Sequence, residues 1–114
     1  MVDAARLRRT SDIAAVRAKG RARSSRLMTV RALVTSTGAV RLAVSGMREA
    51  GSAVARNRAR RRVSAALRAE LAGIPGAPSA DLLVSARAAA ARAPFAELRA
   101  AARQALDTAL GARP

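Results

Sequence analysis

The sequence predicts one α/β domain, a two-layer α+β sandwich in which helices pack against a single β-sheet. Three observations support this prediction. The chain has 114 residues, which is enough for one modest hydrophobic core. Stretches with alternating apolar residues and stretches with helical spacing follow one another in the order α–β–β–α–β–α. Turn and cap residues separate these stretches, and no segment repeats another.

The helix predicted near the N-terminus begins at Thr10 or Ser11, either of which can accept a hydrogen bond from a free amide of the first turn. It ends at Gly20. Ile13 and Val16 are its apolar residues at helical spacing and are expected to face inward.

Two strands are predicted to follow this helix. Residues 27–34 place apolar side chains on one face and polar ones on the other, which is typical of a half-buried strand. Residues 39–45 repeat this alternation after a turn at 35–38, so the two strands are expected to form a hairpin. Residues 21–26 are read as a polar, basic connector.

The second half of the chain predicts a long helix, a buried strand and a last helix. The long helix runs from about Ser52, its candidate N-cap, to Leu71, and Gly73 follows its end. Residues 81–87 form a nearly continuous apolar run, which predicts a more buried strand. The last helix opens at Pro94. It repeats apolar side chains at helical spacing, namely Phe95, Leu98, Ala102, Leu106 and Ala109.

Positive charge dominates the composition. The chain has 22 Lys and Arg against 7 Asp and Glu, a net charge of +15. Residues 1–72 hold 17 of the basic and 4 of the acidic residues. Such a segment repels itself unless a polyanion is near, and arginine matches phosphate geometry. Nucleic acid is therefore the expected partner, with an anionic membrane surface as the second choice.

The same composition excludes several classes of chemistry. Without Cys or His, the chain has no thiol chemistry, no zinc site of the usual kind and no imidazole catalysis. The seven carboxylates are scattered, so neither a metal site nor a catalytic residue is expected in the protein itself. No apolar run approaches the roughly 18 residues that span a bilayer. The N-terminus lacks the apolar stretch of a secretory signal. The chain is therefore expected to be cytoplasmic, with no membrane partner.

The long helix separates an apolar stripe from a basic stripe. At 100° per residue, the apolar side centres on Ala59. The opposite side carries Asn57, Arg61, Ser64 and Arg68, flanked by Arg58, Arg60 and Arg62, with Arg56 in the first turn. Like charges this close destabilise an isolated helix. Phosphates would remove that cost, and Asn57 can both donate and accept hydrogen bonds.

The stretch "GSAVARNRARRR" at residues 51–62 resembles the signature of the bacterial ribonuclease P protein component. The flanking segments resemble the same family in order and spacing, so the resemblance covers nearly the whole chain. It implies a single domain over residues 1–114, with a flexible basic arm at residues 1–10, element order αβββαβα, a mixed sheet and a left-handed β–α–β crossover. The extra strand would fall at residues 21–25. The resemblance also implies cleavage of the 5′ leader from precursor tRNA by a catalytic RNA, as a subunit of a ribonuclease P holoenzyme.

Site residues follow from this resemblance, position by position. Contact with the catalytic RNA is implied for Arg56, Asn57, Arg58, Arg60, Arg61 and Arg68. A cleft for the leader strand is implied at Ile13, Arg17, Lys19 and Arg31. Three of these positions, Ile13, Arg17 and Arg31, are often aromatic in the family, so leader binding here is expected to be more electrostatic. The resemblance implies Mg²⁺ held by the RNA, no cofactor bound by the protein alone and no obligate protein partner.

Three other functions remain open at this level. A ribosomal or general RNA-binding protein of similar fold would share the charge but would not need Asn57 between two arginines. A membrane-surface module would use the long helix as an anchor, although the apolar stripe is too small-sided to insert well. A mostly disordered basic chaperone conflicts with the two strands and the last helix.

Overall fold

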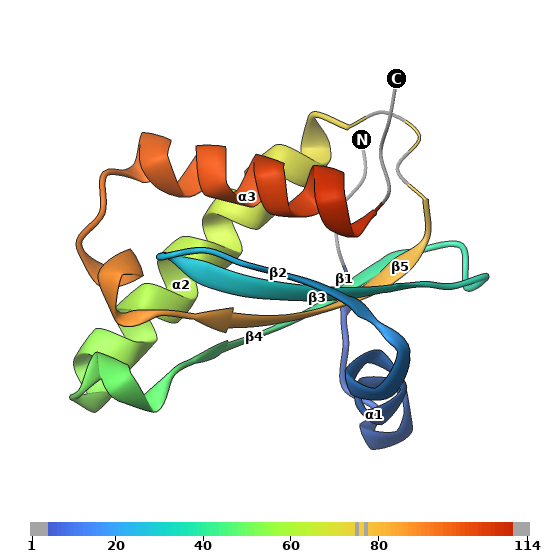
Figure 1. Cartoon of the computed structure of the whole chain (residues 1–114), viewed down its shortest axis with the longest axis horizontal. Coiled ribbons are helices and arrows are strands. Elements are labelled where there is room, and N and C mark those ends of the chain that lie inside the picture. Colours follow the sequence, from blue (N-terminus) through green and yellow to red (C-terminus); the bar gives the residue numbers. More distant parts are fainter. Residues whose placement is uncertain (1–4, 75, 77, 111–114) are drawn as a thin grey trace.

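A five-stranded mixed sheet lies between two layers of helix in the computed structural model, which describes residues 5–74, 76 and 78–110. The strands are β1 (Ala5–Arg6), β2 (Arg21–Ser24), β3 (Met28–Val34), β4 (Val40–Gly46) and β5 (Ala80–Ala86). The α-helices are α1 (Thr10–Lys19), α2 (Ala53–Ala72) and α3 (Phe95–Ala109), and the short 3-10 turns are η1 (Arg48–Ala50) and η2 (Ala88–Ala91). Helices α2 and α3 cover one face of the sheet, and α1 lies against the other (Figure 1).

The sheet order is β1-β4-β5-β3-β2. Strand β4 runs parallel to both β1 and β5, while β3 is antiparallel to both β5 and β2. Helix α2 connects β4 to its parallel neighbour β5. The mixed sheet and the β–α–β crossover confirm the predicted fold class, and β2 is the additional strand expected at residues 21–25. The two predicted layers are joined by α1, which packs against the face of the sheet away from α2 and α3.

The core fills the layer between the sheet and the helices α2 and α3. Alternate residues of the three long strands point into it, among them Val30, Leu42 and Leu82. The helices contribute small and medium aliphatic side chains such as Ala59 and Leu106. The predicted inward stripe of the long helix is confirmed, since its fully buried positions are Ala59, Val63, Ala66, Leu67 and Leu71.

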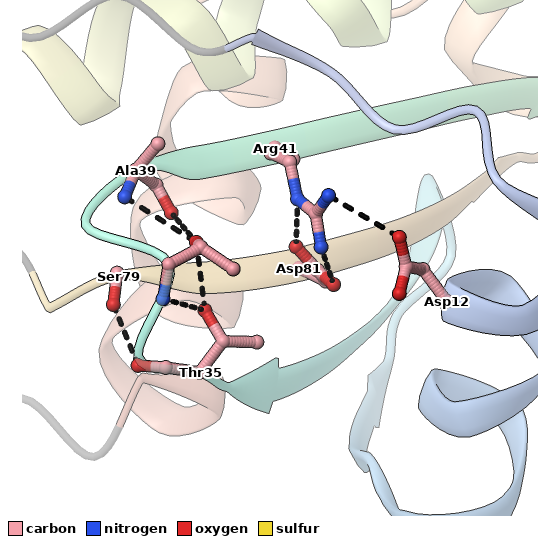
Figure 2. A network of polar contacts seen from close by, with 7 residues as sticks. Asp12, Thr35, Ala39, Arg41, Ser79 and Asp81 are labelled. Carbon is pink, nitrogen blue, oxygen red and sulfur yellow. Dashed lines mark hydrogen bonds and ion pairs between the residues drawn. The ribbon is translucent and has the colours of Figure 1, made fainter.

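The expected hairpin of residues 27–34 and 39–45 is wrong. Strands β3 and β4 form, but β5 lies between them and pairs with both. The physical reason is burial, because β5 is apolar along most of its length and the centre of a sheet shields both of its faces. The loop that joins β3 to β4 therefore spans the start of β5. It is tied there by Ser79 Oγ, which donates to the carbonyl of Thr35 at 2.6 Å (Figure 2).

Part of the expected N-terminal arm is attached to the sheet. Within the stretch 1–10, Ala5–Arg6 forms β1, which pairs with β4. The next residue, Leu7, is buried, and its amide donates to the carbonyl of Leu42 at 3.0 Å. Burial of Leu7 and the parallel pairing of β1 with β4 hold this segment in place, although the sequence predicts a flexible arm here. Residues 1–4 lie outside the described residues.

Helices α1 and α2 differ in how their N-termini are capped. Ser52 caps α2 as predicted, and its hydroxyl accepts from the amide of Ala55 at 3.1 Å. Helix α1 begins one residue after Arg9, and neither predicted cap residue acts as its cap. Before α2, Gly51 has φ 89°, a conformation that favours glycine, and it turns the chain into the helix.

Candidate nucleic-acid interface

Helix α2 presents its basic stripe to solvent. Asn57, Arg58, Arg61 and Arg68 are exposed, and Arg56 and Arg60 are half-buried. The helix is oriented by close backbone packing at its first turn, because a Cβ at Gly46 would lie 2.6 Å from the carbonyl oxygen of Arg56. The end of β4 can therefore approach α2 only through a glycine. The structure thus brings the predicted RNA-contact residues together on one outward surface, called here the α2 basic face.

Asn57 is engaged with a neighbouring arginine. Nη2 of Arg60 donates to Oδ1 of Asn57 at 2.7 Å. This bond uses the acceptor of the amide and fixes the arginine one turn along the helix. Asn57 is exposed, and this bond leaves its two N–H donors available to acceptor oxygens of a ligand.

Two shallow hollows flank the α2 basic face. The first, of about 260 Å³, is lined by Val54, Asn57, Arg58, Arg61 and Arg62. The second, of about 180 Å³, is lined by Arg6, Leu42, Val44, Arg60, Ser64 and Arg68 and is called here the Arg6 hollow. Sequence reasoning missed Arg6 as a member of this surface, because only the pairing of β1 with β4 brings it beside α2.

Arg62 differs from the other arginines of the helix. Its Nη1 donates to the carbonyl of Ala90 at 2.8 Å, and its Nη2 donates to the carbonyl of Ala93 at 2.5 Å. These carbonyls belong to η2 and the residues that follow it, which lead into α3. Arg62 therefore holds the start of α3 against α2, in addition to lining the first hollow.

The described carboxylates neutralise arginines at other places. Glu97 pairs with Arg26, Glu49 with Arg87, and Glu70 with Arg99 and Arg103. Asp107 pairs with Arg103, while Asp12 and Asp81 pair with Arg41. Among the described residues, none of these ion pairs involves an arginine from 56 to 62. Positive charge is therefore concentrated on the α2 basic face rather than spread evenly.

A groove on the opposite face of the sheet gathers two of the predicted leader residues. It has a volume of about 430 Å³ and is lined by Arg17, Thr29, Arg31, Ser45, Leu83 and Ser85. Arg17 comes from α1, and the other residues come from β3, β4 and β5. Two cations and three hydroxyls around one leucine suit a strand that carries both phosphates and bases.

The other two predicted leader residues lie elsewhere. Lys19 is exposed at the end of α1 and lines a different hollow with Arg21 and Leu110. Ile13 is half-buried on α1 and lines neither hollow. Ile13 lies one turn before Arg17 on nearly the same side of α1, so the two residues are neighbours along the helix although only Arg17 lines the groove.

An ion-pair cluster fixes α1 beside this groove. Arg41 forms a forked contact with the buried Asp81, in which Nε donates to Oδ1 at 2.7 Å and Nη2 to Oδ2 at 2.6 Å (Figure 2). The same guanidinium reaches Asp12 in the first turn of α1, at 3.2 Å from Nη1 to Oδ2. Its hydrogen bond to Asp81 raises the pKa of Arg41, so the guanidinium is charged at neutral pH.

Neither a metal site nor a membrane span is found in the part of the chain that the structure describes. The Asp and Glu side chains of this part do not gather in threes at metal-binding distances. None of its helices has the length and apolarity needed to cross a bilayer. The polar side chains that line the two surfaces carry guanidinium, amide and hydroxyl groups.

Comparisons with known proteins agree on one family. The family model described as Ribonuclease P matches residues 1–110. No curated protein sequence matches the chain. Among solved structures, the RNase P protein from Thermotoga maritima has a TM-score of 0.71 and 22% identity, over 96% of this chain and 98% of that one. The RNase P protein from Staphylococcus aureus has a TM-score of 0.69 and 21% identity, over 96% of this chain and 94% of that one.

Proposed function

The chain belongs to the ribonuclease P protein family, as the protein subunit of that ribonucleoprotein, and from this premise we propose a binding role for each of its two basic surfaces. The α2 basic face binds the catalytic RNA. The groove between α1 and the sheet binds the 5′ leader of precursor tRNA. The protein contributes affinity and positioning, while the RNA carries out the magnesium-dependent hydrolysis that removes the leader.

The observation that carries this proposal is the distribution of charge. Most of the described carboxylates hold arginines that join elements of the fold, whereas the exposed Arg58 and Arg61 and the half-buried Arg56 have no acidic partner among the described residues. Maintaining such a helix face costs free energy through like-charge repulsion. A phosphate backbone recovers that cost and releases counterions on binding.

The groove supports the second half of the proposal. Arg17 and Arg31 approach it from different elements, so one strand lying in the groove would contact both. Guanidinium planes can stack on bases and also pair with phosphates, which suits a single strand of varied sequence. With no aromatic side chain lining the groove, most of the affinity for the leader is electrostatic.

The chemistry of hydrolysis belongs to the RNA in this proposal. The polar side chains of the two surfaces are arginine, asparagine, serine and threonine, and none of these is a general base at neutral pH. Magnesium ions bound by the RNA would activate the attacking water. The protein requires no cofactor of its own, no membrane and no obligate protein partner, and it acts in the cytoplasm.

A cleavage assay tests this function directly. Precursor tRNA is incubated at low magnesium with the RNA subunit from the same organism, with and without the protein. We expect strong stimulation by the wild type, and at least tenfold weaker binding to the RNA subunit for Asn57→Ala and Arg61→Ala. With about six phosphate contacts, log affinity should fall against log salt with a slope near −4 to −5.

A matched control removes an arginine from the far edge of the sheet. Arg26 is 64% exposed and pairs only with Glu97 in the described structure, so Arg26→Ala removes the same charge at little cost in stability. It should bind and stimulate like the wild type. Tight but indiscriminate RNA binding, without stimulation of cleavage by the wild type, would instead favour a general RNA-binding protein.

A further inference from the structure

The Arg6 hollow joins residues that are far apart in the sequence. Arg6 comes from β1, Leu42 and Val44 from β4, and the remaining three lining residues from α2. On α2, the residues Arg60, Ser64 and Arg68 follow one another at intervals of four, so they line one side of the helix. None of the described lining residues is acidic.

The backbone places Arg6 firmly at this position. Arg6 is in parallel register with Leu42, whose side chain belongs to the core between the sheet and α2. Neighbouring residues of paired strands point to the same face of a sheet, so Arg6 points toward α2. Leu7, on the other face, is 3% exposed and anchors the segment directly after Arg6. The guanidinium thus starts from a fixed backbone rather than from a free arm.

The chemistry of this hollow fits one kind of ligand. The hollow is lined by three guanidinium groups, one hydroxyl and the aliphatic side chains of Leu42 and Val44. Arg6 and Arg68 are exposed and Arg60 is half-buried, so an anion in the hollow would meet several cations at the surface, where water and salt screen each contact. A volume of about 180 Å³ is below the range of pockets that hold drug-sized molecules, so the hollow suits a phosphate group rather than a whole nucleoside.

We propose that the Arg6 hollow is a phosphate-binding site that takes one backbone phosphate of the RNA subunit. Arg6 would supply a third cation that the two arginines of α2 cannot supply alone. The phosphate would also fasten β1 to α2, so that RNA binding strengthens the docking of β1 onto the sheet. The identity of the RNA in this inference rests on the proposed function, whereas the presence of the anion site does not.

The first experiment tests the anion site without any RNA. Thermal unfolding of the whole chain is followed while inorganic phosphate replaces chloride at constant ionic strength. The Tm of the wild type should rise with phosphate concentration, because a ligand that binds only the folded state stabilises it. Arg6→Ala and the length-conserving Arg6→Gln should lose most of that gain. Arg8 lies two residues from Arg6, is exposed and does not line the hollow, so Arg8→Ala should keep the gain in stability.

The second experiment tests the source of the phosphate. Binding of the RNA subunit is measured against salt concentration for the wild type, Arg6→Ala and Arg8→Ala. Loss of one charge-assisted contact should weaken the Arg6→Ala complex about tenfold. It should also make the salt slope shallower by about 0.7 to 0.9. Arg8→Ala should change both quantities by less.

Each result decides a separate point. An equal phosphate response in the wild type, Arg6→Ala and Arg6→Gln would refute the anion site. A response that depends on Arg6, combined with unchanged RNA affinity in Arg6→Ala, would make the hollow a site for a free anion and overturn its assignment to the RNA backbone. A wild type that responds to phosphate through Arg6 but does not bind the RNA subunit would refute the proposed function and leave the anion site standing.

Discussion

The ion-pair cluster at Arg41 gives the sharpest prediction about stability. Asp81 is only 2% exposed, and the described structure gives its carboxylate a forked partner in Arg41. Arg41→Ala would leave that charge buried without its partner. Breaking a buried pair in this way costs about 3 to 5 kcal/mol of unfolding free energy. The Arg41 side chain is 25% exposed, so water can enter the vacated space, and the low end of about 3 kcal/mol applies.

This free energy converts to a large thermal shift. A chain of 114 residues loses about 4 °C in Tm for each kcal/mol. Arg41→Ala should therefore unfold about 12 °C below the wild type, as measured by circular dichroism or calorimetry. Asp12→Asn is the matched control, because its contact with Arg41 is longer, at 3.2 Å, and both side chains are partly exposed. It should cost about 0.5 kcal/mol, or roughly 2 °C.

A double variant separates charge burial from loss of packing. Arg41→Met combined with Asp81→Leu removes both charges and keeps the space filled, so it should lie within about 1 kcal/mol of the wild type. The reasoning is refuted if Arg41→Ala lowers the Tm no more than Asp12→Asn does. It is also refuted if the double variant costs the sum of its two single substitutions, because groups in direct contact must couple.

Two further substitutions separate structure from binding. Arg62→Ala removes charged hydrogen bonds to Ala90 and Ala93, so it should lower the unfolding free energy by about 1.5 to 3 kcal/mol. It should weaken RNA-subunit binding less than Arg61→Ala does. Equal stability of the two variants in urea would contradict this. In the groove, Arg17→Phe exchanges a cation for an aromatic ring. It should therefore keep affinity for a leader-bearing substrate while making the salt slope shallower, and an unchanged slope would place Arg17 outside the leader path.

Local patterns in the sequence predicted local structure well. The Ser52 cap, the buried stripe of α2 and the buried character of β5 all follow from short-range chemistry. The exposed stripe of α2 follows from the same helical period, so most of the proposed RNA-subunit contacts could be found without coordinates. Helical phase alone placed Asn57 and Arg61 on the outward side.

Pairing between distant segments was not predictable from the same signals. The turn at residues 35–38 favours a hairpin, but it carries no information about a third strand that arrives 40 residues later. A two-residue strand such as β1 has no periodicity to read, and its basic composition resembles that of a free arm. The hydrogen bonds of Arg62 could not be predicted for the same reason, since its acceptors are the backbone carbonyls of Ala90 and Ala93, which are distant in the sequence.

The absence of an acidic residue at one position of α2 argues that its basic face serves binding rather than folding. A glutamate at position 64 would lie four residues from both Arg60 and Arg68, and each such pair stabilises a helix by a few tenths of a kcal/mol. The chain has Ser64 there instead, while the described carboxylate of the same helix, Glu70, is directed to α3. Helix stability alone would favour the acidic residue. A hydroxyl among arginines is instead the side chain that leaves the Arg6 hollow open to a phosphate.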